Sequence, residues 1–394
     1  MNGRIKTLVN VCLIIALYYF IYYIYQGLLN PVPALGDSWD YHIPIANTII
    51  NGSFLHLSNV VLPKWYYPGS SEAFTAVFIL LKIPTLSNIF AAIALFFACW
   101  KLGKTFNLSR HFAILFAVAF ITLNIVLRWL NAISIDFWVG VFFVLSIILL
   151  ERPKKSSLYF VQLGFTFGML IGSKYSAIFF VLLLSIFYFK TLVRFLNIKR
   201  MVAFLIPFFI FGLFWYVRNY FSTSNPFYPM HILGFKGSEL IGNNVLTEIL
   251  KHPLDLLNAV FGEYKLWLLS VLVALGALIH QFIIKKEFKL NSISKLFLIG
   301  LINLIFYFSF PSSIHPWDMV SGLRYSLPAS IPLMLGVFML AQEYKKEELL
   351  AYFTLINMVN VLTMTYYPKL LLIYLPISVA IIYLLNRNLK LKSS

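Results

Sequence analysis

Six side chains that can bind or activate a substrate follow one another at residues 37–42, in the order Asp, Ser, Trp, Asp, Tyr, His. A carboxylate held at the edge of a bilayer can act as a general base or as a metal ligand. The carboxylate of Asp37 can also cap a short helix that begins near Ser38, by accepting hydrogen bonds from exposed backbone N–H groups. Asp40 can share the chemical role or only hydrate the loop. Both interpretations of this segment stay open at the level of sequence.

Three cations, Arg218, Arg324 and Lys174, stand at the ends of apolar runs. A guanidinium can hold a phosphate group through two parallel hydrogen bonds, so these positions suit the headgroup of an anionic lipid. The alternative for each is snorkelling, in which a long cationic side chain at a helix end reaches ordinary lipid headgroups. Arg128 has a similar position, but nothing around it matches a functional pattern.

The remaining polar candidates have structural explanations of equal or greater weight. Asp136 and Glu72 each begin an apolar run, where a carboxylate caps a helix and interacts favourably with its dipole. Capping is the better single explanation for Glu72. His42 can orient a substrate or simply pair with Asp40. Asp37, Asp40 or Asp136 could hold Mg²⁺ or Mn²⁺, but no pair at metal-ligand spacing such as HExxH occurs, so the sequence requires no cofactor.

The elements that position these residues are membrane spans. Sixty per cent of the 394 residues are hydrophobic and 11% are charged, which excludes an ordinary soluble domain. The two cysteines lie alone in apolar runs, so no disulfide framework is expected. A basic start followed by an apolar run of about 22 residues exceeds the core of a signal peptide and predicts a retained first span. We expect an all-α integral membrane domain over residues 1–394, a bundle of about twelve helices, because each span needs about 20 apolar residues. The approximate spans are 8–29, 73–100, 112–128, 136–150, 158–172, 175–190, 201–217, 265–284, 296–310, 325–341, 349–366 and 370–385.

The basic residues give the orientation of these spans. Of the 31 Lys and Arg residues, 21 fall in the gaps on one side, nine fall on the other, and Lys82 lies within the span 73–100. Cytoplasmic loops collect Lys and Arg, so we expect a multi-pass protein of the cell membrane with both termini in the cytoplasm. The net charge of +17 is therefore explained by topology, and nucleic acid is not an expected partner.

Two long segments, 30–72 and 218–264, then lie on the extracytoplasmic face. Their amphipathic stretches Ile43–Ile50 and Leu246–Leu257 predict short helices along the membrane interface. Most of the acidic residues fall on the same face, so any chemistry is expected there. Lys82 and Pro84 interrupt the run 73–100 and could divide a short interfacial helix from the span proper.

Three short motifs resemble one family of membrane enzymes. The stretch DSWDYHIPIA at 37–46, followed by YYPG at 66–69 and Glu72, resembles the first outer loop of GT-C glycosyltransferases. The motifs W-x-x-R-N at 215–219 and N-P-x-x-P at 225–229 are similar to those of bacterial members, of the protein mannosyltransferase and ArnT type. R-Y-x-L-P at 324–328 resembles their late motif.

The resemblance implies an inverting transfer of a sugar from a polyprenyl-phosphate carrier to an acceptor hydroxyl or amine on the outer face. The acceptor could be a protein, a lipid or a glycan. Asp37 matches the loop carboxylate that acts as catalytic base, whereas Asp40 departs from the commonest arrangement, in which a second acid directly follows the first. The leaving phosphate needs cations rather than a general acid, and Arg218, Arg324 and Lys174 are the candidates. The resemblance also places Tyr41 and His42 at the substrate, and an acid such as Asp136 near the carrier headgroup or a metal.

Two other functions compete with this prediction. A polymerase or ligase that uses lipid-linked glycan shares the donor chemistry. A transporter or flippase with twelve spans shares the topology, but it is expected to carry ionisable residues near the membrane midplane, often on interrupted helices. In this sequence the polar candidates gather at one surface, which favours the transferase.

Overall fold

A computed structural model describes residues 3–30, 33, 36–55, 62–154, 156–194, 197–238, 245–251, 253–309 and 322–361. Within these ranges all regular structure is helical and no strand is formed; a single isolated bridge joins Ile232 and Phe235. The prediction of an all-α protein is confirmed. The last expected span, 370–385, lies outside the described residues.

The chain forms two compact units, each assembled from separate stretches of sequence. Unit 1 comprises Met1–Tyr19, Cys99–Arg128 and Asn243–Ser394, and unit 2 comprises Phe20–Ala98 and Trp129–Gly242. Helices α1 (Gly3–Leu29) and α4 (Ser87–Thr105) have residues in both. The other elements of unit 2 are η1 (Ser38–His42), α2 (Ile43–Ile50), η2 (Ser53–Leu55), η3 (Pro63–Tyr66), α3 (Glu72–Leu80), η4 (Pro84–Leu86), α7 (Asp136–Glu151), α8 (Ser157–Ser173), α9 (Ala177–Phe187), α10 (Phe189–Arg194), α11 (Ile198–Phe208), η5 (Phe209–Leu213) and α12 (Phe214–Thr223). Those of unit 1 are α5 (Arg110–Ile121), α6 (Asn124–Leu127), α13 (Val245–Lys251), α14 (Pro253–Tyr264), η6 (Lys265–Leu268), α15 (Leu269–Ile279), η7 (His280–Ile284), α16 (Ser292–Phe308), η8 (Leu323–Ser326), α18 (Leu327–Glu343) and α19 (Glu347–Val361).

Five continuous helical stretches among the described residues are long and apolar enough to cross a membrane. They are Gly3–Leu29, Pro84–Thr105, Ile198–Thr223, Pro253–Ile284 and Leu323–Glu343. Four shorter apolar helices, Arg110–Ile121, Ser157–Ser173, Ala177–Phe187 and Ser292–Phe308, coincide with further expected spans. Apolar runs therefore located the helices, while the count of twelve spans stays a prediction.

The run 73–100 is divided as its polar interruption suggested. Helix α3 ends at Leu80, Lys82 adopts a left-handed backbone conformation (φ 60°), and Pro84 opens the next stretch. The two amphipathic stretches are also helical: α2 occupies Ile43–Ile50, and the second stretch falls on α13 and α14. Pro253 is the first residue of α14, a position at which the missing N–H of proline costs no hydrogen bond because the first N–H groups of a helix have no partner within it.

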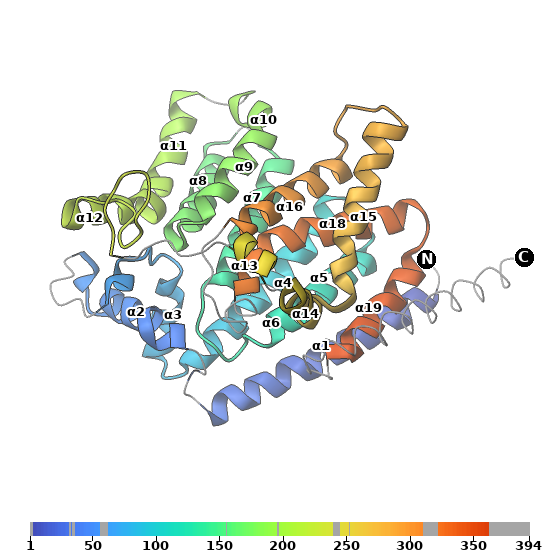
Figure 1. Ribbon diagram of the computed structural model, residues 1–394, viewed down its shortest axis with the longest axis horizontal. Helices are drawn as coiled ribbons and strands as arrows, with labels where there is room; N and C mark the ends of the chain where they lie inside the picture. Colours follow the sequence, from blue (N-terminus) through green and yellow to red (C-terminus); the bar gives the residue numbers. More distant parts are fainter. Residues whose placement is uncertain are drawn as a thin grey trace, which may run out of the picture. The chain divides into compact units, whose positions relative to one another are not determined.

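Helix α8 forms the packing centre of unit 2, where α7, α9, α11 and η5 lie against it (Figure 1). Gly164, Gly168 and Gly172 recur at every fourth position on α8, so they share the face that approaches α11 and η5. A Cβ added at Gly168 would lie 2.9 Å from the carbonyl oxygen of Pro207. Small residues at this spacing let two helix backbones pack closely in a membrane. This contact fixes the stretch that leads into α12.

Unit 1 is built around α16 and α18, which pack against each other and against α15. Phe338 of α18 is fully buried and its ring contacts those of Phe112, Phe116 and Trp267. Helix α16 begins where Asn291 accepts a hydrogen bond from the backbone N–H of Ser294, a side-chain cap of the usual kind. Aromatic side chains thus form part of the packed interior of unit 1.

Candidate functional site

The Asp37–His42 segment is a short helical turn in unit 2, and most of it, Ser38–His42, is π-helical. Ser38 and His42 are buried, Trp39 and Asp40 are exposed, and Asp37 and Tyr41 are half-buried. Asp37 makes no side-chain capping bond, and its own backbone is already helical. The capping explanation for Asp37 is therefore wrong. π-Helical turns are rare and occur often at functional sites.

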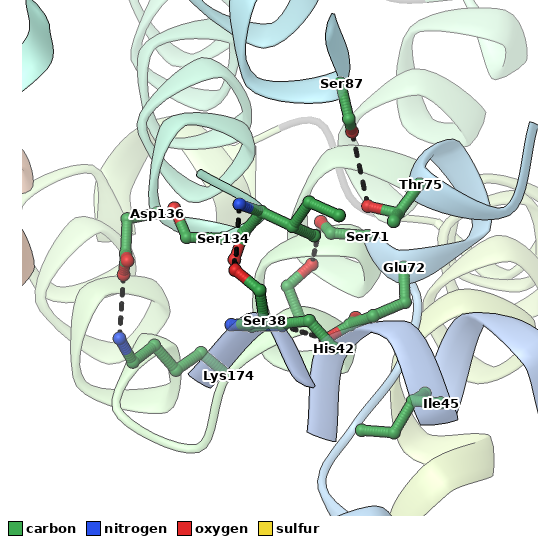
Figure 2. A network of polar contacts seen from close by, with 12 residues as sticks. Ser38, His42, Ile45, Ser71, Glu72, Thr75, Ser87, Ser134, Asp136 and Lys174 are labelled. Atoms are coloured by element: carbon green, nitrogen blue, oxygen red, sulfur yellow. Dashed lines mark hydrogen bonds and ion pairs between the residues drawn. The ribbon is translucent and has the colours of Figure 1, made fainter. Parts of the chain in front are cut away.

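Ser38 ties this segment to the turn before α7. Its Oγ donates to the carbonyl oxygen of Ile133 and accepts from the N–H of the same residue, both at 3.1 Å (Figure 2). On the exposed side, the indole of Trp65 donates to the backbone oxygen of Asp40 at 3.0 Å. The backbone around both carboxylates is therefore held from two directions, which is the preorganisation that a catalytic group requires.

His42 anchors the end of the same turn by bonding to Glu72 in the first turn of α3. Their side chains are each 1% exposed, and His42 Nδ1 lies 3.0 Å from Glu72 Oε1 (Figure 2). Among the described residues nothing hydrogen-bonds to the other carboxyl oxygen, Oε2. Burial raises the pKa of the Glu72 carboxyl, the bond to His42 opposes that shift, and the charge of Asp136 adds to it. The partner of His42 is thus Glu72 and not Asp40, and Glu72 is used for this pairing rather than for capping alone.

Asp136 and Lys174, two candidates far apart in the sequence, form an ion pair in unit 2. Asp136 stands in the first turn of α7, and Lys174 follows the last residue of α8. Lys174 Nζ lies 2.7 Å from Asp136 Oδ1, with side-chain exposures of 24% and 6% (Figure 2). The side chain of Lys174 is more exposed than that of Asp136, so its ammonium group could also bind an external anion.

Arg218 is buried and bonds to backbone and side-chain oxygens in unit 2. Its Nη2 donates to the carbonyl oxygen of Tyr66 and to Asn219 Oδ1, both at 2.8 Å, and its Nε donates to the same Asn219 oxygen at 3.0 Å. A longer bond of 3.4 Å joins Nη1 to the carbonyl oxygen of Phe54. The guanidinium also lies over the ring of Trp215 at 4.8 Å. Arg218 therefore holds the segment that contains Phe54 and Tyr66 in place, a role that the sequence did not indicate.

Asn219 and the N-P-x-x-P motif complete this buried framework. Asn219 Nδ2 donates to the carbonyl oxygens of Tyr66 and Tyr228 and to the hydroxyl of Tyr175. Asn225 Oδ1 accepts from the N–H of Phe227, and its amide donates to Met230. Both asparagines satisfy backbone groups of irregular segments, which would otherwise be costly to bury.

Arg324 and Arg128 belong to unit 1. Arg324 is 2% exposed, lies 5.1 Å from the ring centre of Tyr325 and donates to its hydroxyl at 3.1 Å. Arg128 pairs with the fully buried Glu263 at 2.5 Å. Arg128 thus has a defined carboxylate partner, and Arg324 keeps its predicted role in binding phosphate as a prediction only.

The described residues contain no group of three or more His, Cys, Asp or Glu side chains that could hold a metal ion. Glu72 and Asp136 influence each other electrostatically, but each already has a basic or hydrogen-bonding partner of its own. The arrangement gives no support to a Mg²⁺ or Mn²⁺ site at Asp37, Asp40 or Asp136.

Unit 2 thus gathers most of the sequence candidates: Asp37, Asp40, Tyr41, His42, Asp136, Lys174 and Arg218. The sequence analysis missed the pairing of His42 with Glu72 and of Lys174 with Asp136. Their separations in the chain, 30 and 38 residues, carry no local signal. The glycine spacing of α8 was a readable signal for close helix packing.

Comparison with known proteins adds one partial match. The part of the chain that the structure describes is all-helical, with five helical stretches long and apolar enough to cross a membrane and a polar network in unit 2. Residues 70–247 match a sequence family described as a domain of unknown function (DUF8201). No curated protein and no solved structure matches the chain. The matched stretch includes Glu72, Asp136, Lys174 and Arg218, whereas Asp37–His42 precede it and Arg324 follows it.

Proposed function

We propose that the protein is an inverting membrane glycosyltransferase that uses a polyprenyl-phosphate-linked sugar. The observation that carries the proposal is the Asp37–His42 segment, because Ser38 and His42 anchor it on the buried side while Asp37 is half-buried and Asp40 is exposed. A carboxylate on a rigid, partly open turn can remove the proton from an acceptor hydroxyl and orient the acceptor oxygen toward the anomeric carbon.

The proposed reaction needs no protein acid. Asp37 takes the proton of the acceptor, the acceptor oxygen bonds to the anomeric carbon from the face opposite the carrier, and the bond to the carrier oxygen breaks. The carrier leaves as a phosphate that is already a weak base. Lys174, with Arg324 and Arg218 as further candidates, would stabilise the charge on that phosphate. The expected acceptor is an extracytoplasmic protein, lipid or glycan.

The topology proposed with this function is a multi-pass cell-membrane protein of about twelve spans. Both termini would be cytoplasmic, and Asp37 would face the outside. Asn51→Cys, in the exposed turn after α2, should then react with an impermeant thiol reagent added to intact cells. Native Cys12 and Cys99 are buried and serve as the unlabelled background.

Transfer by the purified protein tests the proposal. Polyprenyl-phosphate donors carrying radiolabelled hexoses or pentoses are incubated in detergent with the native chain and with Asp37→Asn, and label is followed into water-soluble and lipid products. We expect release of sugar from at least one donor by the native chain and a loss of about 100-fold or more in Asp37→Asn. Absence of turnover of every donor, with a native melting temperature, would contradict it.

One observation favours a second candidate, a transporter. His42 and Glu72 form a buried pair in unit 2, each 1% exposed, and buried ionisable groups mark ion and proton pathways in transporters. Proteoliposomes carrying the protein and a pH-sensitive dye distinguish the two functions. Proton or solute flux that persists in Asp37→Asn would favour transport.

A further inference from the structure

The buried pair of His42 and Glu72 is outside the proposed chemistry, yet it connects the two elements on which the reactive turn depends. His42 ends η1 and directly precedes α2, while Glu72 opens α3, against which α2 packs. The two side chains, 30 residues apart, meet at 3.0 Å with 1% exposure each. The pair therefore links the turn η1 directly to α3, the helix against which α2 packs.

Burying two ionisable groups costs free energy that an apolar contact would not cost. A buried polar pair is therefore weak evidence for stability, and its best-attested use is to fix the register of one element against another. Here one rotation of η1 makes both contacts, because Ser38 and His42, at the two ends of this turn, face inward to Ile133 and Glu72. That rotation turns Asp40 to the exposed side and leaves Asp37 half-buried.

The aromatic neighbours strengthen this coupling. The ring of Tyr41 lies 4.1 Å from that of His42, and Tyr41 meets the ring of Tyr67 edge-on at 5.4 Å. Tyr67 continues the contact to Tyr175, which follows α8. A shift of His42 away from Glu72 would therefore also disturb the contacts of Tyr41.

We propose that Glu72, acting through His42, is a positioning residue that fixes the rotation of the Asp37–His42 segment and thereby directs the Asp37 carboxylate. The catalytic part of this inference rests on the proposed function. The structural part, the fixed rotation, does not.

Hydrogen exchange measured by mass spectrometry tests the structural part on the full chain in detergent. Glu72→Ala removes the partner of His42, and Glu72→Gln keeps its shape and hydrogen-bonding capacity. The matched control is Thr75→Val, which removes a buried hydroxyl one turn further along α3 that bonds to Ser87 at 3.3 Å and not to the turn. Peptides from α7 and α8 report whether each variant is folded.

We expect exchange at residues 38–46 to rise by about tenfold or more in Glu72→Ala, to rise less in Glu72→Gln, and to stay native in Thr75→Val. Exchange in α7 and α8 should stay native in all three. Exchange at 38–46 within about twofold of native in folded Glu72→Ala would overturn the inference. Equal loosening of 38–46 in Thr75→Val would overturn it as well, because α3 would then act only as general support.

Transfer kinetics test the catalytic part. Glu72→Gln should lower kcat with little change in KM, and it should cause no further loss in the Asp37→Asn background, because both changes would act on the same carboxylate. Equal losses in the native and Asp37→Asn backgrounds would refute positioning through Asp37. Failure of the native chain to turn over any donor would instead refute the proposed function, while the exchange result would still decide the fixed rotation.

Discussion

The Asp37–His42 and Trp215–Asn219 segments both carry motifs of the same resemblance, but unit 2 uses them in opposite ways. In the first segment, Ser38 and His42 bond inward while Trp39 and Asp40 are exposed. In the second, Arg218 and Asn219 are buried, and both bond to the carbonyl oxygen of Tyr66. The Asp37–His42 segment exposes a charged side chain, whereas the Trp215–Asn219 segment holds the loop that follows Asp37–His42 in place. Residues of the two motifs therefore have different structural tasks, which the motif sequences alone do not tell apart.

The largest expected effect is on the holding segment. Arg218→Ala should lower the free energy of unfolding by about 3 kcal/mol or more, since it removes charged hydrogen bonds to Tyr66 and Asn219 and the contact with Trp215. Thermal melting followed by tryptophan fluorescence measures the change. The matched control is the exposed Arg110, whose change to alanine should leave the melting temperature within about 1 °C. An equally small shift for Arg218→Ala would show that these bonds do not hold the loop, and phosphate binding would then be the remaining role proposed for Arg218.

A smaller effect is expected where α8 meets α11. Gly168→Ala places a Cβ 2.9 Å from the carbonyl oxygen of Pro207, and overpacking of this kind costs about 1–3 kcal/mol. Gly276 in α15 has open space around its added Cβ, so Gly276→Ala should be neutral or stabilising by up to about 1 kcal/mol. Both variants are compared by the same melting experiment. Equal melting temperatures for the two variants would show that the contact between α8 and α11 accommodates the added Cβ without loss of stability.

The physical reasons for success and failure of the sequence analysis differ between these regions. Spans such as 136–150 and 158–172 were recovered as α7 and α8, because apolar run length is a local property. The pairing of Asp136 with Lys174, and the bonds of Arg218 to loop carbonyls, depend on which helix ends meet in space. The residue types at these positions suggested catalysis or phosphate binding. Only the tertiary contacts show that Arg218 holds a loop and that Glu72 binds His42.

A pH dependence is expected from Glu72. Its pKa is raised mainly by burial, with His42 on the adjoining turn and Asp136 on α7 as the charged or titratable neighbours that also act on it. As pH rises above about 4.3, the unfolded chain releases this proton while the folded chain retains it, so stability falls until the raised pKa is passed. Melting temperatures across this range should therefore fall more steeply for the native chain than for Glu72→Gln. Parallel curves would show that the carboxyl titrates as it does in the unfolded chain.

The smallest effect on stability is expected at the exposed side of the Asp37–His42 segment. Asp40→Asn should change the free energy of unfolding by no more than about 0.5 kcal/mol, because the side chain is exposed and Trp65 bonds to the backbone oxygen of Asp40. Urea unfolding followed by tryptophan fluorescence measures this difference. A loss comparable to that of Arg218→Ala would show that both segments hold structure, and the contrast between them would disappear.

The most direct measurement of the contrast is a single-turnover rate of sugar release from a polyprenyl-phosphate donor, for Asp37→Asn protein whose melting temperature equals that of the native chain. If Asp37 is the base presented by its turn, we expect the rate to fall by about 100-fold or more while the fold is unchanged. A rate within about twofold of native would contradict the assignment of Asp37 and leave its segment with a structural role alone.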